Sequence, residues 1–377
     1  MTRLAKIIIA IASFLAPFTV ASAQGLFNTP GVGYEFNTFA GKVLKHSPKF
    51  HLPIPDLSYG FDLNIIEKTS GNKSWHQRRR FPTVGVGICY TNYGIDSVYG
   101  KCLGLYANLT IPIISLKNFQ WTLRIGDGVG YVTHFYDRHP ISDTINNAIG
   151  SHFNDYATFN TDLRYTVNEH WDVQAGLNFS HISDGSYHQP NLGVNLYGAH
   201  LGLRYFPVTS KPKLEIQKQT PLKNRFLFEA RAGLAFTQSE AAMGPSYPVY
   251  LGSAYVSRRW RSKNKVFVGA DYSYHSGVYA FMTNNLLHPG DEYSYSYNTG
   301  VFVGNEYLFG RAGIMLQVGY YLHQTGLKLD PYYEKLGGNF YLIQREHGVV
   351  KELFISALLK THRTIAELAE FGIGFGI

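Results

Sequence analysis

Polar and apolar residues alternate along most of the chain with a period of two. From Thr158 to Val167 the even-numbered residues are polar and the odd-numbered residues are mostly apolar. After a tight turn at Asn168 and Glu169, the alternation resumes and continues to Ser183. Strict alternation places polar side chains on one face of a strand and apolar side chains on the other. The pattern therefore predicts amphipathic strands joined by a hairpin turn.

The spacing of these runs indicates how the strands connect. Most runs have about the 9–11 residues that a tilted strand needs to cross a membrane. Short connections such as 168–169 and 308–310 alternate with long ones such as 134–155 and 277–292. Short turns at one end and long loops at the other are typical of outer-membrane barrels. We therefore predict an all-β protein, an antiparallel transmembrane β-barrel of the outer-membrane type with roughly 12–16 strands.

The first residues are typical of a secretory signal peptide. Arg3 and Lys6 precede an apolar stretch at residues 7–20, and residues 21–23 read Ala-Ser-Ala. A basic start, a short apolar core and a small-residue cleavage motif occur in this order in signal peptides. Residues 1–23 are therefore predicted to be removed on export.

The remaining residues, 24–377, are predicted to form the barrel, with one candidate boundary inside them. Residues 208–222 are rich in Lys and Pro and lack alternation. They separate a first half, 24–207, from a second half, 223–377. The second half either completes one barrel with the first or forms a second barrel.

Composition and charge support an exported membrane barrel. The chain has 28 Tyr, 25 Phe and 38 Gly, and only 16% of its residues are charged, a composition that favours strands over helices. The formal net charge of +8 fits contact with anionic lipid headgroups, and its basic residues are too scattered to favour a nucleic acid as partner. We expect the protein in the cell outer membrane.

The two cysteines, Cys89 and Cys102, lie near the facing ends of two predicted strands. In an oxidising compartment they could form a disulfide that pins one hairpin. Two buried thiols are an equally good interpretation, and the sequence does not decide between them.

Common catalytic motifs are missing from the sequence. It contains no Gly-x-Ser-x-Gly, His-Glu-x-x-His, P-loop or Cys-x-x-Cys. No cofactor and no metal site are therefore predicted.

One polar group lies on the apolar face of its strands. His181 and Ser183 are two residues apart and share the face of Val173 and Leu177, which is the lipid-facing side. A symmetric hairpin pairs position 181 with Asn195 on the returning strand. Three polar side chains would then meet on the outside of the barrel near its rim, where polar groups are costly unless they serve a function.

These residue types fit a serine hydrolase that acts on a lipid within the membrane. Ser183 is the predicted nucleophile, His181 its general base, and Asn195 the residue that orients the imidazole. Backbone N–H groups of Asp184 and Gly185, with the side chain of Asn191, are the predicted oxyanion hole. The alternative is that His181 and Ser183 only mark the headgroup interface, where polar residues are tolerated.

At these residues the chain resembles the PagL-type lipid A deacylase family, also called acyloxyacyl hydrolases. The family pattern His-x-Ser-Asn and Pro-Asn-x-Gly-x-Glu aligns with residues 181–184 and 190–195. The resemblance implies that His181 and Ser183 are catalytic and that Asn191 lies near the oxyanion. Asp184 replaces the family asparagine and Asn195 replaces the glutamate. A looser likeness to long members of the family covers most of the mature chain.

The resemblance implies an outer-membrane serine ester hydrolase that removes an acyl chain from lipid A, the membrane anchor of lipopolysaccharide. The motif is also similar to that of outer-membrane phospholipase A, a calcium-dependent dimer, in which the asparagine also follows serine by 12 residues (195 − 183 = 12). In that alternative the substrate is a phospholipid. A porin or structural barrel with a decayed motif is the non-enzymatic alternative. The sequence leaves a homodimer open.

Overall fold

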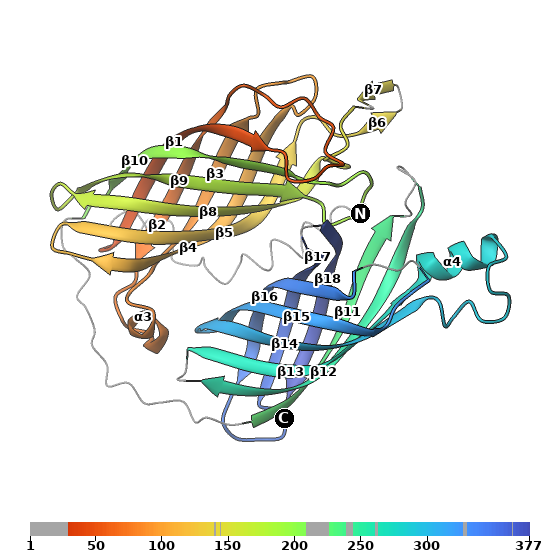
Figure 1. Ribbon diagram of the computed structural model, residues 1–377. Helices are drawn as coiled ribbons and strands as arrows, with labels where there is room; N and C mark the ends of the chain where they lie inside the picture. Colours follow the sequence, from red (N-terminus) through yellow and green to blue (C-terminus); the bar gives the residue numbers. More distant parts are fainter. Residues whose placement is uncertain are drawn as a thin grey trace, which may run out of the picture.

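The alternating residues form antiparallel strands in the computed structural model of the chain (Figure 1). The structure describes residues 29–138, 141–143, 145–208, 226–238, 244–260, 263–326, 330–363 and 365–377. The predicted signal peptide and nearly all of the predicted boundary segment lie outside the described residues. In the described part of the chain, no helix has the length and apolar character needed to cross a membrane.

Eight strands from the first half close into one barrel. They are β1 (Val32–Leu44), β2 (Ser58–Lys68), β3 (Thr83–Asn92), β4 (Lys101–Ser115), β5 (Phe119–Val132), β8 (Phe153–Thr166), β9 (Trp171–Ser183) and β10 (Val194–Tyr205). A short helix, α3 (Ser74–Arg78), lies between β2 and β3, and a small hairpin of β6 (Asp137–Arg138) and β7 (Ile141–Asp143) lies between β5 and β8. The tight turn predicted at 168–169 joins β8 to β9.

Eight strands from the second half close into another barrel. They are β11 (Phe226–Gln238), β12 (Ser246–Trp260), β13 (Asn264–His275), β14 (Tyr297–Phe309), β15 (Ala312–His323), β16 (Tyr332–Gln344), β17 (Glu352–His362) and β18 (Ile365–Gly376). One helix, α4 (Ser276–Asn284), follows β13 in the long connection to β14.

The predicted antiparallel barrel of outer-membrane type is confirmed, but the expected single barrel of roughly 12–16 strands is wrong. β10 returns to pair with β1, so that Asn195 faces Leu44, and β18 pairs with β11 in the same way. Each half therefore closes on itself, and the strands make two barrels of eight. Alternation shows which face of a strand is apolar, but it does not show with which distant strand the last one pairs.

The disulfide that the sequence allowed is not formed. Cys89 faces Gly104 and Cys102 faces Thr91, so the two cysteines lie two register positions apart on β3 and β4. Both are free and buried. The alternative of two buried thiols is the one the structure shows.

Charged side chains fill the interior of both barrels. In the first barrel, Arg124 is only 2% exposed and its Nη2 lies 3.2 Å from Asp62 Oδ2. In the second, Lys265 Nζ lies 2.7 Å from Glu352 Oε2. Burying a charge costs several kcal/mol unless it is paired and hydrogen-bonded, and these charges are paired. The polar face predicted from alternation is therefore the inner face, and the apolar face points outward.

The end of the first barrel where β9 stops and β10 begins carries the longest connection, between β5 and β8, and we call it the loop end. The opposite end, with the turn between β8 and β9, is the turn end. Buried apolar residues form a cluster under the long connections, including Phe50, Ile149, Ile182 and Leu196. The ends of β9 and β10 therefore pack against a buried apolar cluster, which stabilises their position.

Candidate active site

Three polar side chains form a continuous hydrogen-bonded chain at the loop end of the first barrel. Ser183 Oγ lies 2.9 Å from His181 Nε2. On the other side of the ring, His181 Nδ1 lies 2.5 Å from Asn195 Oδ1. Because an amide oxygen only accepts hydrogen bonds, Nδ1 carries the proton and Nε2 is left to accept the Ser183 hydroxyl proton. This is the tautomer that a general base needs.

The strands explain why these residues meet. β9 and β10 pair antiparallel with His181 directly opposite Asn195, as the symmetric hairpin predicted. Ser183 is two residues beyond His181 on the same face of β9, so its hydroxyl reaches the same imidazole. Side chains directly opposite each other in an antiparallel pair have Cβ atoms about 5 Å apart, close enough for a histidine and an asparagine to bond.

The face that carries the three residues is the outer face, but it is increasingly covered toward the loop end. Leu177, earlier on this face of β9, is 62% exposed, whereas Ser183 is only 3% exposed. His181 lies between them in sequence and is half-buried. The hydroxyl is therefore at the edge of the lipid-facing surface but shielded from bulk solvent.

Asn191 places an amide beside the turn that follows Ser183. Its Oδ1 accepts a hydrogen bond from the backbone N–H of Asp184 at 3.1 Å. Its Nδ2 is buried and has no hydrogen-bond partner among the described residues. An unpaired buried donor costs free energy in the resting protein and can stabilise a negative oxygen that develops nearby. Asn191 therefore offers a free side-chain donor beside the turn after Ser183, while the Asp184 N–H, which was also predicted for the oxyanion hole, is engaged with Asn191 itself.

The carboxylate of Asp184 is held by groups of the surrounding loops. Its Oδ2 accepts from Ser151 Oγ and from the backbone N–H of His188, each at 3.1 Å. The same oxygen lies 3.3 Å from His188 Nδ1. These contacts hold one oxygen of the carboxylate on the surrounding loops.

Gly193 brings the backbone close to the imidazole of His181. Its φ of +76° is unfavourable for any residue with a side chain. A Cβ at this position would lie 2.7 Å from His181 Cε1 and 3.3 Å from Ser183 Cβ. The backbone N–H of Gly193 donates to Ala148 O at 2.8 Å, which fixes the entry into β10. Glycine is therefore required for both conformation and space.

Sequence reasoning missed the residues that support this site from other loops. His46 Nε2 lies 2.9 Å from Leu192 O, and Ser151 reaches Asp184 from the β7–β8 connection. Both contacts join positions far apart in sequence, so a local motif could not reveal them. His152, the next residue after Ser151, bonds Val132 O and stacks on Tyr131.

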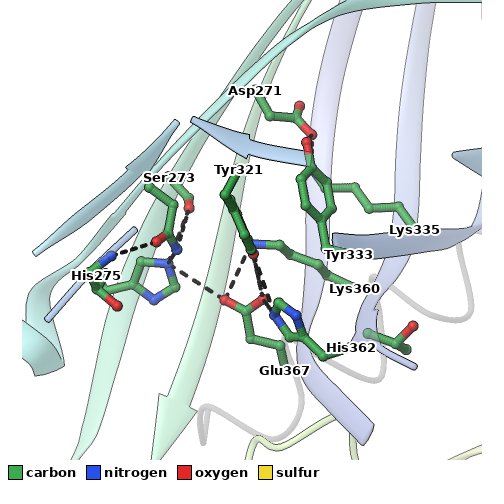
Figure 2. Close-up of polar contacts among 12 residues, drawn as sticks. Asp271, Ser273, His275, Tyr321, Tyr333, Lys335, Lys360, His362 and Glu367 are labelled. Carbon is green, nitrogen blue, oxygen red and sulfur yellow. Dashed lines mark hydrogen bonds and ion pairs between the residues drawn. The ribbon is translucent and has the colours of Figure 1, made fainter. Parts of the chain in front are cut away.

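The second barrel holds another group of polar side chains, but on its inner face (Figure 2). His275 Nε2 lies 3.1 Å from Ser273 Oγ and 3.6 Å from Glu367 Oε1. His362 contacts the other oxygen of Glu367 at 2.8 Å. Both the serine and the glutamate meet His275 at one nitrogen, so the glutamate cannot orient the ring from the opposite nitrogen as in a catalytic triad. The group acts as interior packing of paired charges.

No group of three or more His, Cys, Asp or Glu residues is arranged to hold a metal ion in the parts of the chain that the structure describes.

Solved structures similar to the chain are outer-membrane barrels. The outer membrane enzyme PagL is 15% identical, with 46% of this chain and 99% of that chain covered and a TM-score of 0.29. Neisserial surface protein A is 14% identical, with 47% and 97% covered and a TM-score of 0.32. A mutant porin of Rh. blastica is 11% identical, with 92% and 99% covered and a TM-score of 0.21. Likenesses this low carry no argument about function. No curated protein matches the chain.

Two family models match consecutive parts of the sequence. The model of lipid A 3-O-deacylase (PagL) matches residues 59–204, which lie in the first barrel and include the Ser183 site. The model of the acyloxyacyl hydrolase C-terminal domain matches residues 225–377, which span the second barrel. The chain therefore belongs to the PagL family of outer-membrane lipid A deacylases.

Proposed function

We propose that this chain hydrolyses an ester bond of lipid A with Ser183 as nucleophile, His181 as general base and Asn195 as the residue that orients the imidazole. The observation that carries the proposal is the unbroken contact from Ser183 Oγ through both nitrogens of His181 to Asn195 Oδ1. A serine hydroxyl is a weak nucleophile until a neighbouring base takes its proton, and this geometry provides that base.

The reaction follows from the positions of these atoms. His181 Nε2 takes the hydroxyl proton while Ser183 Oγ attacks the ester carbonyl carbon, and the carbonyl oxygen becomes negative. Asn191 Nδ2 is the side-chain donor available for that oxygen. The bond between the carbonyl carbon and the sugar oxygen then breaks, and the imidazolium gives its proton to that oxygen. The sugar leaves as an alcohol, and Ser183 keeps the acyl group as an ester. Water, activated by the same imidazole, releases the fatty acid.

The location of the site suits a substrate that stays in the membrane. The three residues belong to the outward face of the barrel, which elsewhere exposes large apolar side chains such as Leu177 and Leu201. An acyl chain can lie along this apolar face while its ester reaches the polar rim. The paired charges that fill the barrel interior argue against a pore through which solutes would pass.

The experiment compares lipid A from cells that make the wild-type protein with lipid A from cells that make Ser183→Ala. Mass spectrometry is expected to show loss of one acyl chain with the wild type and intact lipid A with the variant. Identical spectra from equal amounts of folded protein would refute the proposal. If the protein instead releases fatty acid from phospholipid vesicles, and this release requires Ser183 and added calcium, the site belongs to a phospholipase. The next test would then be whether the protein forms a homodimer.

A further inference from the structure

The turn that follows Ser183 is in contact with the second barrel. Ser186 Oγ donates to Ala366 O at the start of β18 at 2.7 Å. The backbone N–H of Gln189 donates to Gln238 Oε1 at the end of β11 at 2.6 Å. Figure 1 shows the connection after β9 meeting the ends of β17 and β18. The turn therefore donates two hydrogen bonds to different strands of the second barrel, and this turn begins next to Ser183.

The contact is close enough to require small residues on both sides. A Cβ added to Gly185 would lie 2.9 Å from Ala369 Cβ, with Leu359 Cδ1 at 3.6 Å. Ala369 and Leu359 face each other across β18 and β17. A larger side chain at position 369 would have to displace the Gly185 backbone, which is two residues from Ser183.

The conformation of the turn needs outside support. Gly185 and Ser186 both have positive φ, 64° and 65°. Positive φ is unfavourable for a residue with a side chain, so Ser186 persists only where contacts hold it. The bond from its hydroxyl to Ala366 O is such a contact. The same turn leads to Asn191, the proposed oxyanion donor.

The barrels also meet at the turn end of the first barrel. Arg79, which follows α3, donates through Nε to Leu308 O at 3.2 Å. Trp75 packs edge-on against Phe309, with ring centroids 6.3 Å apart. Contacts at both ends fix the second barrel against the first, which a barrel held only by a linker would not show.

We infer that the second barrel is part of the catalytic apparatus, because it holds the turn from Asp184 to Gln189 in the conformation that catalysis requires. Gln238 and Ala369 are positioning residues in this role. The inference rests on the proposed hydrolysis at Ser183. The inference gives the second barrel a positioning role in the reaction at the loop end of the first barrel.

The test uses full-length protein with one substitution on each contact. Ala369→Leu places bulk against Gly185, and Gln238→Met removes the acceptor for the Gln189 N–H. Gln238→Glu keeps an acceptor oxygen for the Gln189 N–H and removes only the bond from Nε2 to Gly244 O at 2.7 Å, so it serves as the conservative rescue. Ala232→Leu makes the same change as Ala369→Leu at an exposed, outward-facing position of β11, so it is the matched control.

Turnover of lipid A in detergent micelles is measured, together with the gel-mobility change on heating that reports a folded barrel. We expect Ala369→Leu and Gln238→Met to lower kcat at least tenfold with KM within about twofold, since the acyl-chain surface is unchanged. Gln238→Glu should recover most of the activity, and Ala232→Leu should match the wild type. If Ala369→Leu fails to fold, the comparison of Gln238→Met with Gln238→Glu tests the inference by itself.

Folded Ala369→Leu and Gln238→Met proteins with wild-type kcat would overturn the inference. So would equal losses in Gln238→Met and Gln238→Glu, because both variants lose the bond to Gly244 O and only Gln238→Met loses the acceptor oxygen for Gln189. Ser183→Ala is measured beside them. Full activity of Ser183→Ala would refute the proposed function itself, whereas an inactive Ser183→Ala with unaffected second-barrel variants would refute only the inference.

Discussion

The side chain of Asn191 gives the sharpest prediction about transition-state stabilisation. Its Oδ1 already accepts from the Asp184 N–H at 3.1 Å, and its Nδ2 is buried without a partner. Asn191→Asp keeps the shape and the acceptor oxygen but replaces the N–H donor with an oxygen. The substitution therefore removes the contact proposed for the reaction while leaving the resting hydrogen bond to the turn in place.

The expected loss follows from measured oxyanion donors. Removal of one donor costs about 2.7–4 kcal/mol in the transition state. Since each 1.36 kcal/mol is tenfold in rate, kcat should fall about 100- to 1,000-fold. The added negative charge would deepen the loss. Little change is expected in KM, because the donor acts on charge that develops only in the reaction.

The assay is release of fatty acid from lipid A, with kcat and KM determined separately. Asn168→Asp is the matched control, because it adds the same charge in the exposed turn between β8 and β9. There Asn168 Oδ1 accepts from the backbone N–H groups of His170 and Trp171, and the substitution keeps that oxygen. A folded Asn191→Asp protein with kcat within about threefold of the control would refute the role of Nδ2.

Three further predictions concern the same region and the cysteines. Asp184→Asn should have equal or higher kcat/KM on lipid A, because it removes a negative charge near the reacting ester and keeps an oxygen for Ser151; a tenfold loss would contradict this. Gly193→Ala should lower kcat about tenfold or more, because it forces positive φ at roughly 1–2 kcal/mol and crowds His181 Cε1; an unchanged kcat would show that the backbone gives way freely. The protein should migrate identically on gels with and without reductant, because Cys89 and Cys102 are free; a reductant-dependent shift would reveal a disulfide.

Local patterns in the sequence carried much of the information about the site. Alternation on β9 indicated that His181 and Ser183 share the outward face, and hairpin symmetry indicated that Asn195 lies opposite His181, which the register confirms. Both arguments use only residues close in sequence, whose geometry is set by the strand itself. The catalytic roles of these residues stay a proposal.

Features that depend on distant pairing could not be predicted in this way. Closure of β10 on β1 joins strands more than a hundred residues apart, and nothing in either strand alone specifies the partner. The contacts of Asp184 with Ser151 and of Gln189 with Gln238 also join residues that are distant in sequence, so local patterns could not predict them. The cysteines depend on the strand register in the same way: Cys89 and Cys102 lie two register positions apart and remain thiols, whereas the sequence alone left a disulfide open.

Labelling with a fluorophosphonate tests the central claim most directly, because this probe bonds to a serine oxygen that a neighbouring base has activated and releases fluoride. Refolded wild-type protein is treated with the probe and digested, and the modified residue is identified by peptide mass spectrometry. The account predicts one added mass on Ser183, absent from Ser183→Ala and strongly reduced in His181→Ala. An unlabelled Ser183 in protein that deacylates lipid A, or labelling that persists without His181, would contradict it.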